Sequence, residues 1–129
     1  MFIEIEPDSA IPIYLQLAQQ IMEGIAREEL APETPLPSVR AFAADLSMNM
    51  HTVNKAYHYL EEKKMIEIIP KKGVFIHKDA VRSATAEEKI RMEEELRPIL
   101  AEALCLQISR EELAAMIEKM VREIREGSK

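Results

Sequence analysis

The sequence predicts a mainly α-helical protein with a small β-hairpin, built as a winged helix-turn-helix and followed by a two-helix C-terminal segment. Three stretches with apolar residues at helical spacing precede two short β-like runs that a tight turn joins, which is the element order of that fold. Two Ser/Thr-x-x-Glu patterns after residue 84 then open two further helices. We therefore expect a winged helix-turn-helix domain over residues 1–78 and a helical segment over residues 79–129.

The first helix is expected to begin at Pro12, because a proline fits the first turn of a helix. Its apolar residues recur at helical spacing and so share one face. They are Ile13, Leu17, Ile21 and Ile25, together with Tyr14 and Ala18. The helix should end near Glu29, since three prolines between residues 32 and 37 enforce a loop.

Two shorter helices should follow with a turn at residues 47–48 between them. Ser38 is a suitable N-cap for a helix that reaches about Leu46, and Asn49 for a helix from Met50 to about Lys63. The residues expected to face the core are Val39, Phe42, Ala43, Leu46, Val53, Ala56, Tyr57 and Leu60. The hairpin that forms the wing should comprise residues 65–69 and 74–77, joined by the basic turn 70–73.

A linker is expected over residues 79–84, before the two C-terminal helices. Thr85 with Glu88 should open a helix that reaches about Leu106, and Pro98 should kink or break that helix. Ser109 with Glu112 should open the last helix, which Gly127 would end. The two apolar stripes of this tail consist of Ile90, Leu96, Leu100 and Leu104, and of Leu113, Ile117, Met120 and Ile124.

Two helices of this length are too small to bury both stripes between them. We therefore expect the stripes to form the interface of a homodimer, which would also present two copies of the third helix to a palindromic site. The alternative is that the tail folds back on the first helix of its own chain.

Charge is unevenly distributed along the 129 residues. The chain has a net charge of −6, but residues 38–78 hold seven Lys and Arg against four acids. This basic middle section permits binding to nucleic acid, for which the distribution of charge matters more than the total. The acidic start lacks the basic region of a signal peptide, and no stretch approaches the roughly 20 apolar residues that span a bilayer. With the single cysteine, Cys105, this favours a reducing cytoplasm and no membrane partner.

The third helix carries the candidate DNA-contacting residues. A helix that enters the major groove points its N-terminal side chains at base edges, and here these are His51, Thr52, Asn54 and Lys55. Asn can bind adenine, a Thr methyl can touch thymine, and Lys can contact guanine or phosphate. The alternative is an ordinary solvated helix face.

Two further sites could contact the DNA backbone. Ser38 and Arg40 stand at a helix start, where free N–H groups and a guanidinium suit a phosphate. For Arg40 the alternative is an ion pair with Asp45 or a nearby Glu. Lys71 and Lys72 at the tip of the wing could reach an adjacent groove, or could simply keep the hairpin from aggregating.

Enzyme chemistry has no visible basis in the sequence. His51 and His58 are two helical turns apart, too far to chelate one ion together, and His77 stands alone on a strand. Cys105 lies between two leucines and is expected to be buried. There is no Ser/His/Asp set and no glycine-rich phosphate loop, so we expect no metal, no cofactor and no catalysis.

Several motifs together are similar to the GntR family of bacterial regulators. They are Leu36-Pro37-Ser38-Val39-Arg40, Thr52-Val53-Asn54-Lys55-Ala56-Tyr57, Leu60 and Gly73-Val74-Phe75-Ile76, and the opening Pro12-Ile13-Tyr14-Leu15-Gln16 resembles the small YtrA-like branch. The resemblance covers roughly residues 10–78. It implies that Arg40 and residues 52–55 contact an operator, that Gly73 lets the wing approach the minor groove, and that the protein is a repressor.

The sequence departs from this family pattern in four places. Glu33, Lys64 and Lys71 stand where the family commonly has glycine, and Met50-His51 replaces a frequent Pro-Asn. Residues 79–129 are too few for the large effector domain of other branches, and nothing in the sequence names an effector. A winged helix that binds protein rather than DNA remains the alternative function, and the acidic total charge favours it slightly.

Overall fold

The computed structural model describes residues 3–127, which fall into two compact units. The first unit comprises the chain up to Val81 together with Ile124–Gly127, and the second comprises Arg82–Glu123. None of the helices within the described range is long and apolar enough to cross a membrane.

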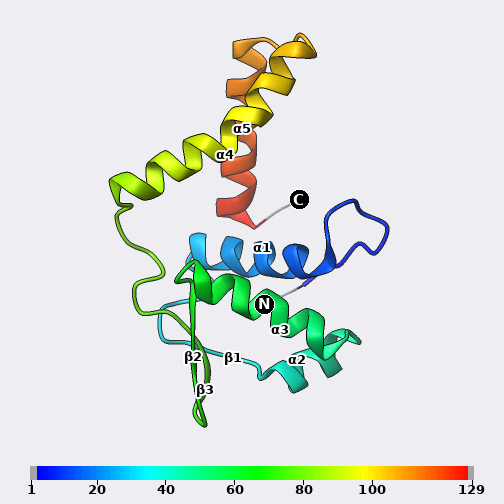
Figure 1. Ribbon diagram of the computed structural model, residues 1–129, viewed down its shortest axis with the longest axis vertical. Helices are drawn as coiled ribbons and strands as arrows, with labels where there is room; N and C mark the ends of the chain where they lie inside the picture. The colour runs from blue at the N-terminus through cyan, green and yellow to red at the C-terminus, as the bar shows by residue number, and fades with distance from the viewer. Residues whose placement is uncertain (1–2, 128–129) are drawn as a thin grey trace. The chain divides into compact units, whose positions relative to one another are not determined.

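Three helices make up most of the first unit: α1 (Ile13–Ala26), α2 (Val39–Leu46) and α3 (Met50–Glu62), with α3 packed against both others (Figure 1). Both predicted N-caps are confirmed, because the Ser38 hydroxyl accepts from the Ala41 amide and the Asn49 side chain accepts from the His51 amide. Helix α1 ends three residues before the predicted Glu29. It stops there because Glu28 adopts a left-handed φ of 66° and the Glu29 and Leu30 amides both turn back to the Gly24 carbonyl.

A three-stranded antiparallel sheet completes the fold, in the order β1-β3-β2. Strands β2 (Ile66–Ile69) and β3 (Gly73–Ile76) form the predicted hairpin. Strand β1 (Pro35–Leu36) was expected to be loop, and it is a strand only because it pairs with Val74 and Phe75 of β3. On the other edge of the sheet, the outward amide of Ile68 donates to the Glu61 carboxylate at 3.3 Å.

One hydrophobic core holds the helices and the sheet of this unit together. The predicted inward residues Phe42, Ala43, Val53, Ala56, Tyr57 and Leu60 are all buried, as are Leu17, Ile21, Ile25, Ile66, Val74 and Ile76. Val39 and Leu46 are half-buried at the margin of this core. The helical spacing of apolar residues therefore identified the packed faces of α1, α2 and α3.

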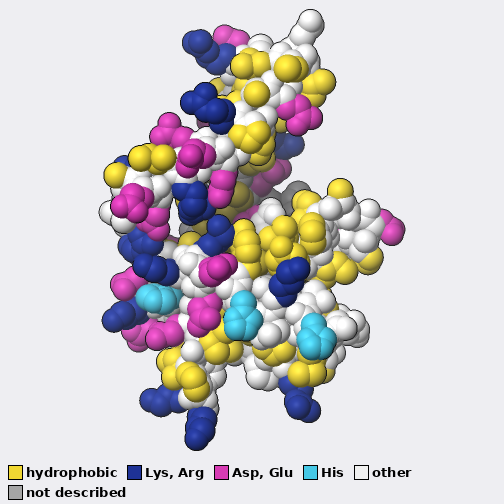
Figure 2. Space-filling model, in the orientation of Figure 1, with side chains coloured by type: hydrophobic (Ala, Val, Ile, Leu, Met, Phe, Trp, Pro, Cys, Tyr) yellow, Lys and Arg dark blue, Asp and Glu magenta, His cyan; other side chains and the backbone are white. Residues whose placement is uncertain are grey.

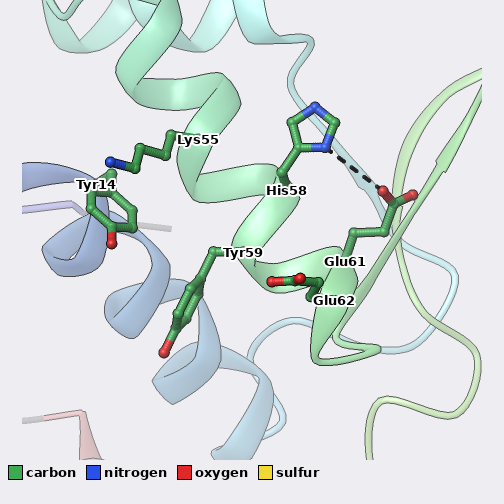
Figure 3. Close-up of a pocket in the computed structure, with 6 residues that line it drawn as sticks. All are labelled: Tyr14, Lys55, His58, Tyr59, Glu61 and Glu62. Carbon is green, nitrogen blue, oxygen red and sulfur yellow. Dashed lines mark ion pairs between the residues drawn. The ribbon is translucent and has the colours of Figure 1, made fainter.

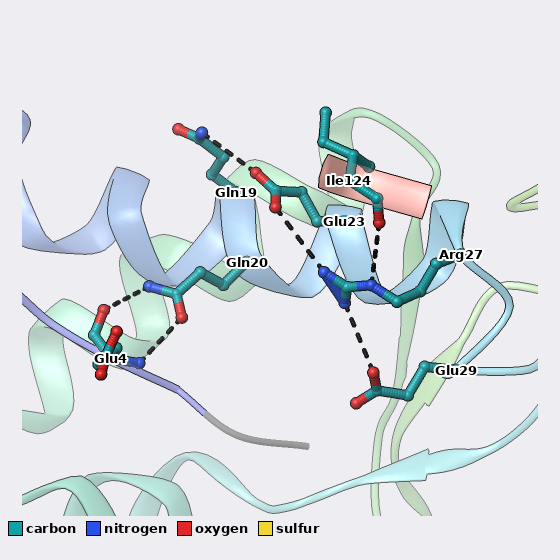
Figure 4. A network of polar contacts seen from close by, with 7 residues as sticks. All are labelled: Glu4, Gln19, Gln20, Glu23, Arg27, Glu29 and Ile124. Carbon is teal, nitrogen blue, oxygen red and sulfur yellow. Dashed lines mark hydrogen bonds and ion pairs between the residues drawn. The ribbon is translucent and has the colours of Figure 1, made fainter. Parts of the chain in front are cut away.

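Polar contacts tie two further segments to α1 (Figure 4). The Gln20 side chain donates to the Glu4 carbonyl and accepts from the Glu4 amide, so the extended lead runs along the helix. Arg27 lies at the other end of α1, where its Nε donates to the Ile124 carbonyl at 3.0 Å. Its guanidinium also lies near the carboxylates of Glu23 and Glu29.

The second unit contains α4 (Ala86–Cys105) and most of α5 (Arg110–Glu126). The capping box of Thr85 and Glu88 is confirmed, and the Ser109 hydroxyl accepts from the Glu112 amide. Pro98 lies inside α4 and does not break it; a proline removes only one N–H, and the freed carbonyl one turn earlier can be hydrated on an exposed helix. The expected burial of Cys105 is wrong: its side chain is exposed, because in α4 only Ala103 is buried.

Candidate nucleic-acid interface

Helix α3 presents a polar outer face whose charge changes along its length. His51, Asn54, Lys55 and His58 are exposed on this face, whereas Thr52 is half-buried. The first ten residues of the helix, 50–59, contain no acid, and the two acids of α3, Glu61 and Glu62, lie in its last turn. The N-terminal part of this helix therefore offers a polyanion one lysine and no acid that would repel it.

The start of α2 offers a second set of donors. Ser38 uses its hydroxyl to cap the helix, and the Arg40 side chain beside it is exposed. The expected alternative, an ion pair of Arg40 with Asp45 or a nearby Glu, does not form among the residues that the structure describes. The guanidinium is thus available to a ligand from outside the chain.

The loop before α2 is fixed from inside the protein. The Tyr57 hydroxyl donates a 2.7 Å hydrogen bond to the Pro37 carbonyl, directly before the capping residue Ser38. Burial raises the pKa of Tyr57 far above its usual range, so this hydroxyl stays protonated and remains a donor.

The hairpin tip carries Lys71, Lys72 and Gly73, all exposed. The Lys72 amide donates to the Ile69 carbonyl, and Gly73 has a φ of 130°, which L-residues rarely adopt. The tip lies at the same end of the unit as α2 (Figure 1), and Lys and Arg side chains project there (Figure 2). Two separate elements therefore direct positive charge toward one side of the unit.

Three positions where the family pattern commonly has glycine adopt the left-handed conformation. Their φ angles are 67° at Glu33, 61° at Lys64 and 69° at Lys71. Glycine reaches this region without the steric cost that a Cβ adds. The chain therefore keeps the turn geometry of the family pattern at all three positions, although residues with a Cβ are strained in this conformation. One of these positions, Lys71, lies in the wing turn.

A groove lies on the outer face of α3 beside Tyr14 of α1, and the sequence did not reveal it (Figure 3). It has a volume of about 460 Å³ and is lined by Tyr14, Lys55, His58, Tyr59, Glu61 and Glu62. The Lys55 ammonium lies 4.3 Å from the centre of the Tyr14 ring. Tyr14 and His58 thus adjoin the predicted DNA-contacting face. The sequence could have placed His58 there, because a residue seven positions after His51 lies two helical turns further along the same side of the helix.

The histidines and the cysteine do not assemble into a site. His58 Nδ1 lies 3.9 Å from the Glu61 carboxylate, and His77 Nδ1 accepts from the Asp79 amide. In residues 3–127 no three His, Cys, Asp or Glu side chains are grouped so that they could hold a metal ion.

The residues predicted for the dimer interface are mostly exposed in the single chain. Leu104 is 64% exposed, and Leu96 and Ile117 are each 51% exposed. Ile90, Leu100 and Met120 are exposed as well, whereas Leu113 and Ile124 are half-buried. The side chains of Leu96, Leu100 and Leu104 line a shallow groove of about 340 Å³ along α4.

Three helices followed by a β-hairpin with a basic tip define a winged helix-turn-helix. The sequence profile described as "Bacterial regulatory proteins, gntR family" matches residues 13–76. The transcriptional repressor YtrA of Bacillus subtilis is 31% identical over 98% of this chain and 98% of its own length.

Solved structures agree with this assignment. The crystal structure of a transcriptional antiterminator from Listeria monocytogenes superimposes with a TM-score of 0.91 at 26% identity, over 100% of this chain and 96% of that one. YtrA from Sulfolobus acidocaldarius, a GntR-family transcription factor, is 40% identical with a TM-score of 0.54, over 94% and 97% of the two chains. The chain belongs to the GntR family, resembles its YtrA-like members, and is a DNA-binding transcriptional regulator rather than an enzyme.

Proposed function

We propose that this protein is a cytoplasmic repressor that binds a palindromic DNA operator as a homodimer. In this proposal the winged helix-turn-helix of residues 1–78 contacts DNA and residues 79–129 hold the two chains together. The observation that carries it is the acid-free N-terminal part of α3, which displays His51, Asn54 and Lys55 on a chain whose net charge is −6.

The contacts divide by chemistry. Asn54 has the amide that can pair with adenine in the major groove, and His51 one turn earlier is exposed beside it. Thr52, half-buried at the margin of this face, has a methyl group that can touch a thymine. These three side chains would read bases.

The backbone contacts would come from the elements that flank α3. Arg40 has a planar fork of donors suited to a phosphate, and the Ser38 turn presents the N-terminal amides of α2. Lys71 and Lys72 would follow the DNA at the wing, where Gly73 has no side chain to obstruct a close approach. Because Arg40 is exposed and forms no ion pair with another described residue, DNA binding would break no internal contact of this side chain.

The homodimer is supported by the exposed apolar side chains of α4 and α5. Burying one leucine or isoleucine contributes about 1.5–3 kcal/mol, and eight predicted positions per chain give a dimer ample surface. Two copies of α3 would then occupy successive major grooves on one face of the duplex. Repression is inferred from the likeness to YtrA of Bacillus subtilis, which is described as a repressor.

Selection of bound sequences from a random duplex pool by the purified full chain tests this function. We expect enrichment of a palindrome, with an affinity that falls steeply as salt concentration rises. Arg40→Ala should weaken binding by about 1–3 kcal/mol. The matched control Arg110→Ala, an exposed arginine at the start of α5, should leave affinity unchanged. No enrichment at any salt concentration would instead favour the protein-binding winged helix.

A further inference from the structure

Lys55 does not extend straight out from α3 but lies along its flank. Its ammonium sits over the ring of Tyr14, which belongs to α1, at 4.3 Å from the ring centre (Figure 3). Asn54, its neighbour in sequence, projects about 100° further round the helix, on the side away from this flank. The two side chains that the sequence placed together as DNA contacts therefore point in different directions.

The Tyr14 ring is itself held in place. It meets the Tyr59 ring edge to face, with centres 6.2 Å apart and planes at 75°. Tyr59 in turn lies under the Lys63 ammonium, 5.0 Å from its ring centre. The four side chains form a row of cation, ring, ring and cation along the seam between α1 and α3.

The Tyr14 ring attracts the Lys55 ammonium and so restricts the lysine side chain, which would otherwise sample many rotamers. The rotamer entropy that a lysine loses on binding a ligand is then partly lost already in the free protein. An ammonium is a point charge that suits phosphate, and it needs no particular base edge. At the flank of a helix seated in the major groove, the nearest part of the DNA is the sugar-phosphate backbone that borders the groove.

We propose that Tyr14 is a positioning residue that holds Lys55 for contact with a backbone phosphate. Lys55 then supplies affinity that is independent of sequence, and base recognition falls to His51, Thr52 and Asn54. This inference rests on the proposed DNA-binding function and deepens it, because it assigns different tasks to adjacent residues of α3.

Affinities of the full-length protein for its selected operator and for an unrelated duplex, over a range of salt concentrations, test this assignment. Lys55→Ala should weaken binding to both duplexes by the same factor and lower the slope of log K against log salt by about one. Tyr14→Leu should weaken binding about two- to fivefold, the factor that corresponds to an exposed cation–π contact. Tyr14→Phe keeps the ring and should bind as the parent does.

The double variant separates positioning from a purely structural effect. If Tyr14 acts through Lys55, then Tyr14→Leu should change affinity in the parent but not in the Lys55→Ala background. An equal loss in both backgrounds, or tighter binding by Tyr14→Leu, overturns the proposal. So does a Lys55→Ala effect confined to the operator, which would make Lys55 a base contact.

The free protein provides a readout that does not depend on DNA. The ring current of Tyr14 should shift the ε-methylene protons of Lys55 upfield in NMR spectra, with the shift lost in Tyr14→Leu and kept in Tyr14→Phe. If the shift is present but no duplex binds, the DNA-binding function fails, and the role assigned to Lys55 fails with it. If DNA binds but the shift is absent, only the positioning role of Tyr14 fails.

Discussion

The hydroxyl of Tyr57 in α3 donates a 2.7 Å hydrogen bond to the carbonyl of Pro37, so one core residue links α3 to the start of α2. This link fixes Ser38 and Arg40 relative to the polar face of α3. The two helices that the proposed function places on DNA are therefore joined by a polar contact as well as by apolar packing.

Tyr57→Phe should lower the free energy of unfolding by about 0.5–1.5 kcal/mol, because it removes the donor and leaves the Pro37 carbonyl without it. Tyr59→Phe is the matched control. The Tyr59 hydroxyl has no hydrogen-bond partner within residues 3–127, so the Tyr59→Phe variant should be as stable as the parent. Urea unfolding of the three proteins at neutral pH gives the comparison, and equal stabilities for both variants would contradict the role of the Tyr57 hydroxyl.

The same pair predicts a pH dependence. Burial raises the pKa of Tyr57 in the folded state above the unfolded value of about 10. The stabilisation by its hydrogen bond to Pro37 is therefore fully present below about pH 10. This stabilisation is lost as the pH rises from the pKa of Tyr57 in the unfolded state through its pKa in the folded state. The stability advantage of the parent over Tyr57→Phe should thus shrink in alkaline buffer above about pH 10. A constant difference across that range would show that the hydroxyl does not stay protonated as we expect.

Glycine should stabilise the left-handed position after α3. Lys64→Gly should raise the free energy of unfolding by about 0.5–1 kcal/mol, since Lys64 has a φ of 61° that a Cβ disfavours. Glu62→Gly, at the last residue of α3, should lower it, by less than the roughly 1 kcal/mol that glycine costs in a helix interior. Thermal melts of the two variants should therefore move in opposite directions, and a loss of stability in both would contradict the strain at Lys64.

The start of α4 should be sensitive to acid. Hydrogen bonds from the Arg82 guanidinium, followed by the Thr85 amide, hold the pKa of Glu88 well below its usual range. The lowered pKa means that this stabilisation is present above the unfolded value of about 4.3 and is lost as pH falls through the folded value. Glu88→Gln should reduce helical content at neutral pH, as circular dichroism would record. Glu87→Gln, its exposed neighbour, should not.

An acidic residue on the tail should dissociate the proposed homodimer. Leu104→Glu places a charge on the α4 stripe and should weaken dimerisation at least tenfold, because one buried leucine contributes about 1.5–3 kcal/mol. The control Ile11→Glu changes another exposed apolar residue in the other unit. Analytical ultracentrifugation should find a shift toward monomer for Leu104→Glu alone. If Leu104→Glu remains as dimeric as the parent, the dimer interface does not include this stripe of α4.

Local signals were sufficient to predict most of the fold. Ser38, Asn49 and Thr85 begin their helices as expected, because an N-cap depends only on a side chain and the backbone two or three residues later. The stripes of α1 and α3 marked the core for a similar reason. Strand β1 was missed because it exists only through pairing with β3, some forty residues further along the chain.

The candidate site was predictable as a set of residues but not as a geometry. The spacing in α3 placed His51, Asn54 and Lys55 on an outer face, and all three are exposed. That Lys55 turns toward Tyr14 depends on how α1 crosses α3, which no local pattern specifies. The burial expected of Cys105 failed because a leucine on either side does not supply a layer of protein to cover a helix.

The sheet has two edges, and each offers an incoming strand few free backbone donors. Strand β1 is two residues long and begins with Pro35, which has no N–H to offer, while the outward amide of Ile68 on β2 already donates to the Glu61 carboxylate. An incoming chain therefore meets no continuous row of free N–H donors on either side. Concentrated solutions of the protein should accordingly resist cross-β fibre growth seeded from the wing.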